Sequence, residues 1–271
     1  MKQGIVKNSL ESKQEALLMT EVKTVTASMI IIGDEILSGR TKDANLTHLS
    51  LWLNRMGVQL REVRVIPDVG QVIQDTVNDL RHGYDYVFTT GGIGPTHDDI
   101  TAENVAKAFG VPFVQSAESL ALLKKHYGTE KISDARLRMT MIPEGSSLIK
   151  NPVSTAPGFQ MENVFVMAGI PVVMQSMLLD LEQRIFGGDK MLSKAIHVFE
   201  GESQFARMLV EVEQEFPHVS LGSYPFFRNK KFGASFVFRS QVAAELDAAV
   251  DMLKLKISAS GREWFDGEAA L

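Results

Sequence analysis

Short apolar runs alternate with longer stretches of helical periodicity along the first two thirds of the chain. Apolar, β-branched runs that stop near a Gly, Pro or Asp are typical of buried strands, and three of them stand at 27–32, 58–66 and 84–90. Between them, the segments 43–57 and 69–83 predict helices, each closed by a glycine. The apolar face of the first helix is formed by Leu46, Leu49, Leu53 and Met56, and Asp43 is its candidate N-cap.

Strands that alternate with helices of this length indicate a parallel sheet covered on both faces. We therefore predict an α/β fold with a doubly wound, mainly parallel sheet. Ligands of such sheets bind beyond the carboxyl ends of the strands. The loops "GDEILSGR" and "GGIGPTHDD", which follow the first and third strands, must then share one edge of the sheet. We expect further contributions to this edge from "NPVSTAPGF" and "MAGIP".

The pattern changes after Gly188, where an order β-α-β-β-α predicts a small split-βαβ domain of the α+β class. We divide the chain into a peripheral or poorly ordered segment 1–26, an α/β domain 27–188 and this smaller domain 189–271. In the last domain, only the cluster of Tyr224, Arg228, Lys230 and Lys231 is suited to reach a phosphate.

Composition excludes several classes of protein. The net charge of −5 disfavours binding to nucleic acid, which depends on clustered Lys and Arg. The absence of cysteine rules out disulfides, thiol catalysis and Cys-based zinc sites. Neither a signal peptide nor an apolar stretch of about 18 residues is evident, so we expect a cytoplasmic protein without a membrane partner.

The candidate chemistry lies in the loop "TTGGIGPTHDD". Glycines at the end of a buried strand allow the backbone N–H groups to approach a phosphate, although a short glycine motif also serves as a simple turn. Asp98 and Asp99 are candidate metal ligands, and the alternative is that one of them caps the following helix. Asp34 and Glu35 are either solvated loop residues or the opposite half of a cation site.

Four segments carry a resemblance to a known family: "IIIGDEILSGRTKDAN", "TTGGIGPTHDDITAENVAKAFG", "IPEG" and "NPVSTAPGF". Together, from about Ser28 to about Asp180, they resemble the molybdopterin-binding-type domain of the competence/damage-inducible protein A family. They are equally similar to the hydrolase domain that precedes eukaryotic FAD synthase. The glycine loop alone is similar to that of molybdopterin adenylyltransferases. Where the bacterial family has Pro-Gly-Pro-Pro and a nearby Glu, this chain has "MAGIPVVM", so a role of that Glu is not transferred.

The resemblance implies metal-dependent hydrolysis of ADP-ribose, FAD or a related dinucleotide, with Mg²⁺, Mn²⁺ or Co²⁺ as the divalent ion. It assigns catalysis to Asp98, Asp99 and Glu35, and the metal to Asp98, Asp99 and Asp34. The residues assigned to phosphate and ligand binding are Gly33, Thr90, Gly91, Gly92, Gly94, Pro95, Thr96, Ser154, Thr155 and Gly158.

Two other functions use the same loop. The pocket would also suit a pterin- or nucleotide-binding module without turnover, or the transfer of an adenylyl group to molybdopterin. Because the loop lies at the rim, Gly92→Val is expected to abolish binding and leave folding largely intact. The resemblance and the apolar helices of the second domain favour a homo-oligomer, most simply a dimer.

Overall fold

The computed structural model describes residues 22–128, 132–154, 156–228 and 230–268. These residues divide into two compact units, one of Thr24–Gly188 and a second that begins at Asp189. Each unit has a hydrophobic core of its own. The predicted N-terminal segment lies mainly outside the described residues. Its last two residues belong to a strand that begins at Val25.

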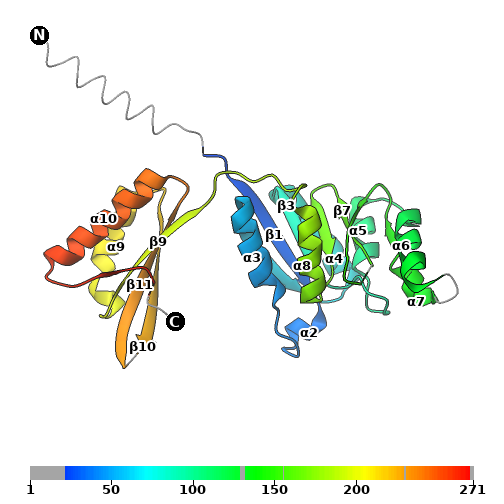
Figure 1. Cartoon of the computed structure of the whole chain (residues 1–271), viewed down its shortest axis with the longest axis horizontal. Coiled ribbons are helices and arrows are strands. Elements are labelled where there is room, and N and C mark those ends of the chain that lie inside the picture. The colour runs from blue at the N-terminus through cyan, green and yellow to red at the C-terminus, as the bar shows by residue number, and fades with distance from the viewer. Residues whose placement is uncertain (1–21, 129–131, 155, 229, 269–271) are drawn as a thin grey trace, which may run out of the picture. The chain divides into compact units, whose positions relative to one another are not determined.

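Helices and strands alternate along the first unit (Figure 1). Its strands are β1 (Val25–Ile32), β2 (Val58–Ile66), β3 (Tyr86–Thr90), β4 (Phe113–Gln115), β5 (Met141–Pro143), β6 (Ser147–Ile149), β7 (Gly158–Met161) and β8 (Val164–Met167). Its helices are α2 (Asp34–Leu37), α3 (Asn45–Met56), α4 (Gly70–Gly83), α5 (Thr101–Phe109), α6 (Ala117–Tyr127), α7 (Asp134–Arg138) and α8 (Pro171–Leu181).

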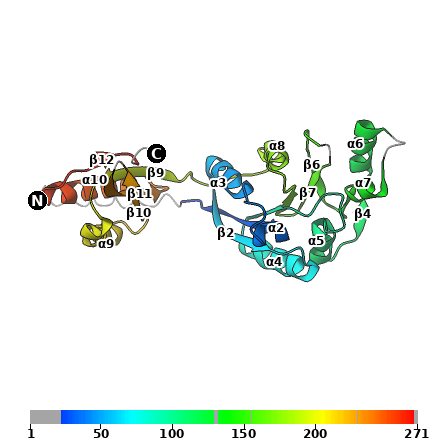
Figure 2. The same ribbon diagram turned by 90° about the horizontal axis from the view of Figure 1, so that it is seen from below.

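The main sheet has six strands in the order β2-β1-β3-β8-β7-β6. The first four strands are parallel, whereas β7 and β6 are antiparallel to their neighbours. Helices α3 and α8 cover one face and α4 and α5 the other, as Figure 2 shows. The predicted α/β fold with a mainly parallel sheet is confirmed.

The continuous run of apolar residues in β1 follows from this arrangement, because both faces of the strand are covered. Met29 and Ile31 pack into the core formed with α3 and α8. Ile30 and Ile32 pack into the core formed with α4 and α5. Alternate side chains of one strand thus fill two cores, and all four are at most 4% exposed.

Of two local signals in the sequence, the glycine acts as expected, whereas the N-cap residue of α3 is Ala44 and not the predicted Asp43, which lies one residue earlier. Gly57 ends α3 in the left-handed conformation, at φ 74°. Asp43 Oδ1 accepts a hydrogen bond from the N–H of Leu46 at 2.8 Å, so this carboxylate satisfies one donor of the first turn. These contacts fix where α3 begins and ends, and with it the end of the loop that follows β1.

The second unit has the predicted β-α-β-β-α order. Its elements are β9 (Leu192–Val198), the short 3-10 helix η2 (Glu202–Gln204), α9 (Ala206–Glu215), β10 (Ser220–Arg228), β11 (Lys231–Ser240), α10 (Ala243–Ala259) and β12 (Phe265–Asp266). The strand order is β10-β11-β9-β12, with antiparallel pairing throughout. Since β11 lies between β9 and β10, those two strands are parallel to each other across it, which is the split-βαβ arrangement. One hydrophobic cluster joins this sheet to α9 and α10.

Candidate functional site

The loops that carry the candidate residues meet at one edge of the six-stranded sheet. Strands β2, β1, β3 and β8 are neighbours and parallel, so their carboxyl ends lie at the same edge. The segment before β7 reaches this edge as well, because β7 runs antiparallel to β8. The four loops expected to converge therefore do so, and the loop after β2 joins them.

The glycine loop follows β3 and is held tightly to its neighbours. Gly91 has φ 103°, and a Cβ there would lie 2.1 Å from the carbonyl oxygen of Ile32. Gly92 has φ 67°, and its Cβ would lie 2.1 Å from Thr101 Oγ1. Both conformations are rare for residues with side chains. The expectation that Gly92→Val leaves folding largely intact is therefore wrong, because the valine would collide with the start of α5.

The same contacts decide which N–H groups of the loop are available to a ligand. The N–H of Gly91 donates to the carbonyl of Met167 at 3.3 Å and is already used. The N–H groups of Gly92, Ile93 and Gly94 have no acceptor among the described residues. Three adjacent backbone donors without acceptors are the kind of group that anion-binding loops use. Thr90 is only 1% exposed, so its hydroxyl lies beneath this loop.

The two aspartates after the glycine loop are not equivalent. Asp99 Oδ2 accepts hydrogen bonds from the hydroxyl of Thr96 and from its N–H, the latter at 2.7 Å. Asp98 is exposed. The Thr96 hydroxyl lowers the pKa of the Asp98 carboxyl below its ordinary value, and the charge of His97 adds to the effect. Asp98 is thus an ionised and accessible carboxylate, whereas Asp99 also stabilises the turn that begins at Pro95.

Neither aspartate caps α5, which corrects that alternative. The N-cap residue is Ile100, and no side chain accepts a hydrogen bond there. The helix start is instead fixed by Thr101, whose N–H donates to the carbonyl of Gly92 and whose hydroxyl donates to that of Gly91, each at 3.0 Å. The glycine loop therefore folds back against the first turn of α5, and the aspartates project from the bend before it.

The loop after β1 adds further carboxylates. Gly33 is buried and its N–H donates to the carbonyl of Ile66 at 3.1 Å, which joins the ends of β1 and β2. Asp34 and Glu35 begin the single turn of α2, and both side chains are exposed. The N–H of Asp34 donates to Asp68 Oδ2 at 3.0 Å. These contacts bring the loops after β1 and β2 together.

Asp68 is a member of the site that sequence reasoning missed. Partial burial raises the pKa of its carboxyl, and the negative charges of Asp34, Glu35 and Asp98 raise it further. Asp68 thus lies close enough to each of these three carboxylates to be repelled by its charge. The signal was present in the sequence, since "IPD" places Asp68 at the carboxyl end of a predicted strand, next to the strand that carries Asp34.

Carboxylate oxygens suit a hard divalent cation. Among the described residues, however, no group of three or more His, Cys, Asp or Glu side chains is close enough to hold a metal ion by itself. Magnesium-type ions in nucleotide sites commonly take one or two carboxylates and complete their coordination with substrate phosphates and water. The donors present fit that second pattern, since Asp34, Glu35 and Asp98 are all exposed.

The segment before β7 forms a turn organised by Asn151. Asn151 Oδ1 accepts hydrogen bonds from the N–H groups of Val153 and Ser154, and its Nδ2 donates to Ser154 Oγ at 2.6 Å. A Cβ on Gly158 would lie 2.3 Å from the carbonyl of Val166, so this glycine serves the packing of β7 on β8. The predicted ligand residue Thr155 lies outside the described residues.

A small pocket opens beside the glycine loop, with a free volume of about 30 Å³. Its polar lining is formed by Gly92, Gly94, Asp99, Glu103 and Arg138. Its apolar lining comes from Ile93, Ala102, Phe113, Met139, Met141, Ile142, Pro157 and Phe159. The space admits one small polar group but not a whole nucleotide.

Comparison with known proteins agrees with this geometry. Residues 28–186 match the model of a family described as "Probable molybdopterin binding domain". The chain belongs to this molybdopterin-binding family. Residues 190–262 match a second family model, "FAD synthase, middle domain". The resemblance stated from the sequence is confirmed, in both of its parts.

Relatives of the molybdopterin-binding family share most of the chain. A protein of Archaeoglobus fulgidus is 34% identical over 197 residues, which cover 73% of this chain and 84% of that protein. A "Probable FAD synthase" of Caenorhabditis elegans is 29% identical over 91% of this chain. The chain spans only about half of that relative, 52% of its length. The solved structure of CinA from Thermoplasma acidophilum, described as of unknown function, covers 59% of this chain at 34% identity, with a TM-score of 0.56.

The loop after β8, where this chain departs from the bacterial pattern, contacts the site through backbone atoms. Asn45 Nδ2 donates to the carbonyl of Gly169 at 2.7 Å. Gly169 in turn packs against Gly91, since a Cβ at Gly169 would lie 3.3 Å from the Cα of Gly91. Asn45 is only 4% exposed and opens α3. Sequence reasoning missed this residue because an asparagine at a helix start is ordinary in itself.

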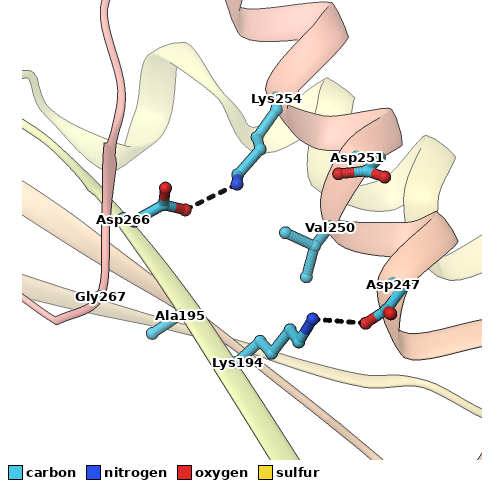
Figure 3. Close-up of a pocket in the computed structure, with 8 residues that line it drawn as sticks. All are labelled: Lys194, Ala195, Asp247, Val250, Asp251, Lys254, Asp266 and Gly267. Carbon is cyan, nitrogen blue, oxygen red and sulfur yellow. Dashed lines mark ion pairs between the residues drawn. The ribbon is translucent and has the colours of Figure 1, made fainter. Parts of the chain in front are cut away.

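The second unit contains a larger pocket of about 400 Å³ between β9, α10 and β12 (Figure 3). Lys194 and Lys254 line it, but each forms a 2.6 Å ion pair, with Asp247 and Asp266 respectively. Asp251 adds another negative charge. Both cations are thus already neutralised, and the pocket is poorly suited to a phosphate.

The basic cluster predicted in the second unit lies beside aromatic rings. Lys231 Nζ is 5.6 Å from the ring centre of Phe199, and the guanidinium of Arg228 is 5.5 Å from that of Phe226. Tyr224 is half exposed and folds its ring over Gly222. These cations contact rings of their own unit, so the glycine loop remains the better phosphate site. Within the part of the chain that the structure describes, no helix is long and apolar enough to cross a membrane.

Proposed function

We propose that this protein hydrolyses the pyrophosphate bond of ADP-ribose, FAD or a related dinucleotide at the rim of the first unit. The observation that carries the proposal is the juxtaposition at one sheet edge of three unused N–H groups and an exposed, ionised carboxylate. The donors on Gly92, Ile93 and Gly94 are suited to phosphate oxygens. Asp98 lies four residues further along the same loop.

The reaction consumes one water molecule. The water oxygen attacks one phosphorus of the dinucleotide, the bond from that phosphorus to the bridging oxygen breaks, and two monophosphates leave. For ADP-ribose these are AMP and ribose 5-phosphate. The backbone donors would hold the phosphate oxygens and stabilise the charge that develops on them.

The carboxylates have two separate tasks in this proposal. A divalent ion, held by Asp98 with Asp99 or Asp34, would supply Lewis-acid stabilisation of the phosphates. Glu35 is exposed at the same edge and would accept the proton of the attacking water. Asp99 lines the pocket and also stabilises the turn through its hydrogen bonds with Thr96.

The test is turnover of the purified chain with ADP-ribose and FAD in the presence of Mg²⁺, Mn²⁺ or Co²⁺, with products separated by chromatography. Asp98→Asn should lose about 10²-fold or more in rate without a change in melting temperature, since its side chain supports only the exposed bend. Asp99→Asn should lose rate and also about 1 kcal/mol of stability, because it weakens the hydrogen bonds to Thr96.

Asp79→Asn is the matched control. This exposed aspartate lies in the C-terminal half of α4, and its carboxylate pairs with Arg64 on the surface. The Asp79→Asn variant should retain full turnover. Wild-type turnover in Asp98→Asn would contradict the proposed role of that carboxylate. A wild-type protein that cleaves none of these compounds, with any of the metals, would identify a binding module instead. AMP transfer from ATP to molybdopterin in place of hydrolysis would identify an adenylyltransferase.

A further inference from the structure

One cation faces the pocket beside the glycine loop. Arg138, the last residue of α7, lines this pocket together with Gly92, Gly94 and Asp99. Its side chain is exposed, and it has no ion pair or hydrogen bond among the described residues. The segment from α6 to β5 that carries it lies at one end of the first unit, beyond α5 (Figures 1 and 2).

The acidic residues of the same pocket have other partners. Glu103 forms a 2.7 Å ion pair with Lys107 on the next turn of α5. Asp99 accepts its hydrogen bonds from Thr96. The guanidinium of Arg138 therefore remains available, although its five donors are well suited to a planar or tetrahedral anion.

The backbone next to Arg138 is firmly supported. The hydroxyl of Thr140 donates to the carbonyl of Leu137 at 2.6 Å and accepts a hydrogen bond from Gln115 Nε2 at 3.1 Å. The carbonyl of Thr140 accepts from the N–H of Ser116 at 2.8 Å. Thr140 is completely buried. The end of α7 is thus tied to β4, so Arg138 is presented to the pocket from a fixed point.

The geometry points to Arg138 as the residue that binds the phosphate group on the glycine loop, opposite the N–H groups of Gly92, Ile93 and Gly94. This inference rests on the proposed function for the identity of the ligand, a nucleoside diphosphate derivative. The guanidinium and the three backbone donors would enclose one phosphate from two sides. Arg138 is therefore a binding residue that selects ligands with a phosphate group over ligands without one.

The experiment measures dissociation constants by calorimetry for pyrophosphate, ADP-ribose and adenosine, with Arg138→Ala and Arg138→Lys beside the wild type. Loss of a charge-assisted, bidentate contact should weaken the binding of pyrophosphate and ADP-ribose about 10- to 100-fold. Adenosine, which has no phosphate, should bind the variant and the wild type equally. Arg138→Lys should recover part of the loss, because an ammonium keeps the charge but not the fork of donors.

Arg136→Ala is the matched control on the same helix. Its guanidinium stacks on Tyr127, 4.0 Å from the ring centre, rather than lining the pocket. The Arg136→Ala substitution removes the same charge as Arg138→Ala and should leave the affinity for pyrophosphate unchanged. An Arg138→Ala variant that binds pyrophosphate as tightly as the wild type would overturn the inference, as would an equal loss for adenosine.

The outcomes separate this inference from the proposed function. If the wild type cleaves ADP-ribose and Arg138→Ala binds and cleaves it equally well, the function stands and the role of Arg138 is wrong. If pyrophosphate binding depends on Arg138 and no metal supports cleavage, the phosphate site stands and hydrolysis is wrong. A wild type that binds none of the three compounds would overturn both.

Discussion

A single methyl group at Gly91 tests whether the glycine loop is built into the fold. In Gly91→Ala, the new Cβ would lie 2.1 Å from the carbonyl oxygen of Ile32, and the backbone would keep φ near 103°. That oxygen belongs to β1, which is hydrogen-bonded to a strand on each side. A residue held in a sparsely populated conformation costs about 1–3 kcal/mol. Overlap in a packed site adds about 1–3 kcal/mol.

Gly91→Ala is therefore expected to destabilise the first unit by about 2–6 kcal/mol, a large part of the 5–15 kcal/mol typical of a domain. Gly110→Ala is the matched control. Gly110 also has positive φ, 66°, but a Cβ there meets nothing within 4 Å. Gly110→Ala should lower the free energy of unfolding by only about 1–2 kcal/mol, which corresponds to the left-handed conformation alone.

Urea unfolding followed by tryptophan fluorescence measures the difference. The chain has two tryptophans, and Trp264 belongs to the second unit. In a Trp264→Phe background, Trp52 therefore reports on the first unit, where it is 3% exposed. The slope of the unfolding free energy against urea should stay constant between the variants. If Gly91→Ala and Gly110→Ala unfold at the same urea concentration, the close approach of the loop to β1 does not exist in solution.

Three further predictions concern charge and assembly. Lys256 lowers the pKa of the Glu211 carboxyl, and Arg207 lowers it further. The ion pair therefore stabilises the fold at pH values above the pKa of Glu211 in the unfolded chain, about 4.3. This stabilisation is lost as the pH falls through the lower pKa of Glu211 in the folded protein. Glu211→Gln should accordingly lower the melting temperature at pH 7, and the difference from wild type should shrink as the pH falls below the unfolded pKa of Glu211. In EDTA, Asp98→Asn should bind ADP-ribose more tightly than the wild type, by a factor that shrinks as salt is raised; weaker binding would mean that Asp98 does not face the phosphates. Light scattering at micromolar concentration should report a dimer, and a monomer would reject the proposed homo-oligomer.

Much of the fold could be predicted from short-range patterns. The isoleucine run of β1, the glycine that ends α3 and the alternation of strands and helices all depend on neighbours within a few residues, and each is found as expected. The convergence of the rim loops also followed, because parallel strands place their carboxyl ends together. What the pattern left open was the contact partner of each side chain within those loops.

The residues that were missed depend on contacts between distant segments. Asp68 matters because β2 is paired with β1, and Asn45 because α3 begins opposite the loop after β8. Arg138 lies in the segment between α5 and β6, and no local pattern in the sequence indicates that this segment reaches the glycine loop. The helix cap assigned to Asp98 or Asp99 failed for the same reason. The loop folds back through Thr101, so the helix begins later than the first polar residues suggest.

Under the proposed function, the charges of the rim are the reason why a phosphate site there would need both a cation from the protein and one from solution. Asp34, Glu35, Asp68 and Asp98 would raise the electrostatic cost of an approaching phosphate, just as the charges of Asp34, Glu35 and Asp98 add to the effect of burial in raising the pKa of Asp68. Three backbone dipoles offset only part of this repulsion, because each N–H carries a partial charge. Arg138 would contribute a full positive charge from the lining of the pocket, and a divalent ion would contribute the rest among the carboxylates. If the proposed hydrolysis takes place, a dinucleotide would contact both cations through its two phosphates, whereas each monophosphate product would contact only one of them. The products would then bind more weakly than the substrate.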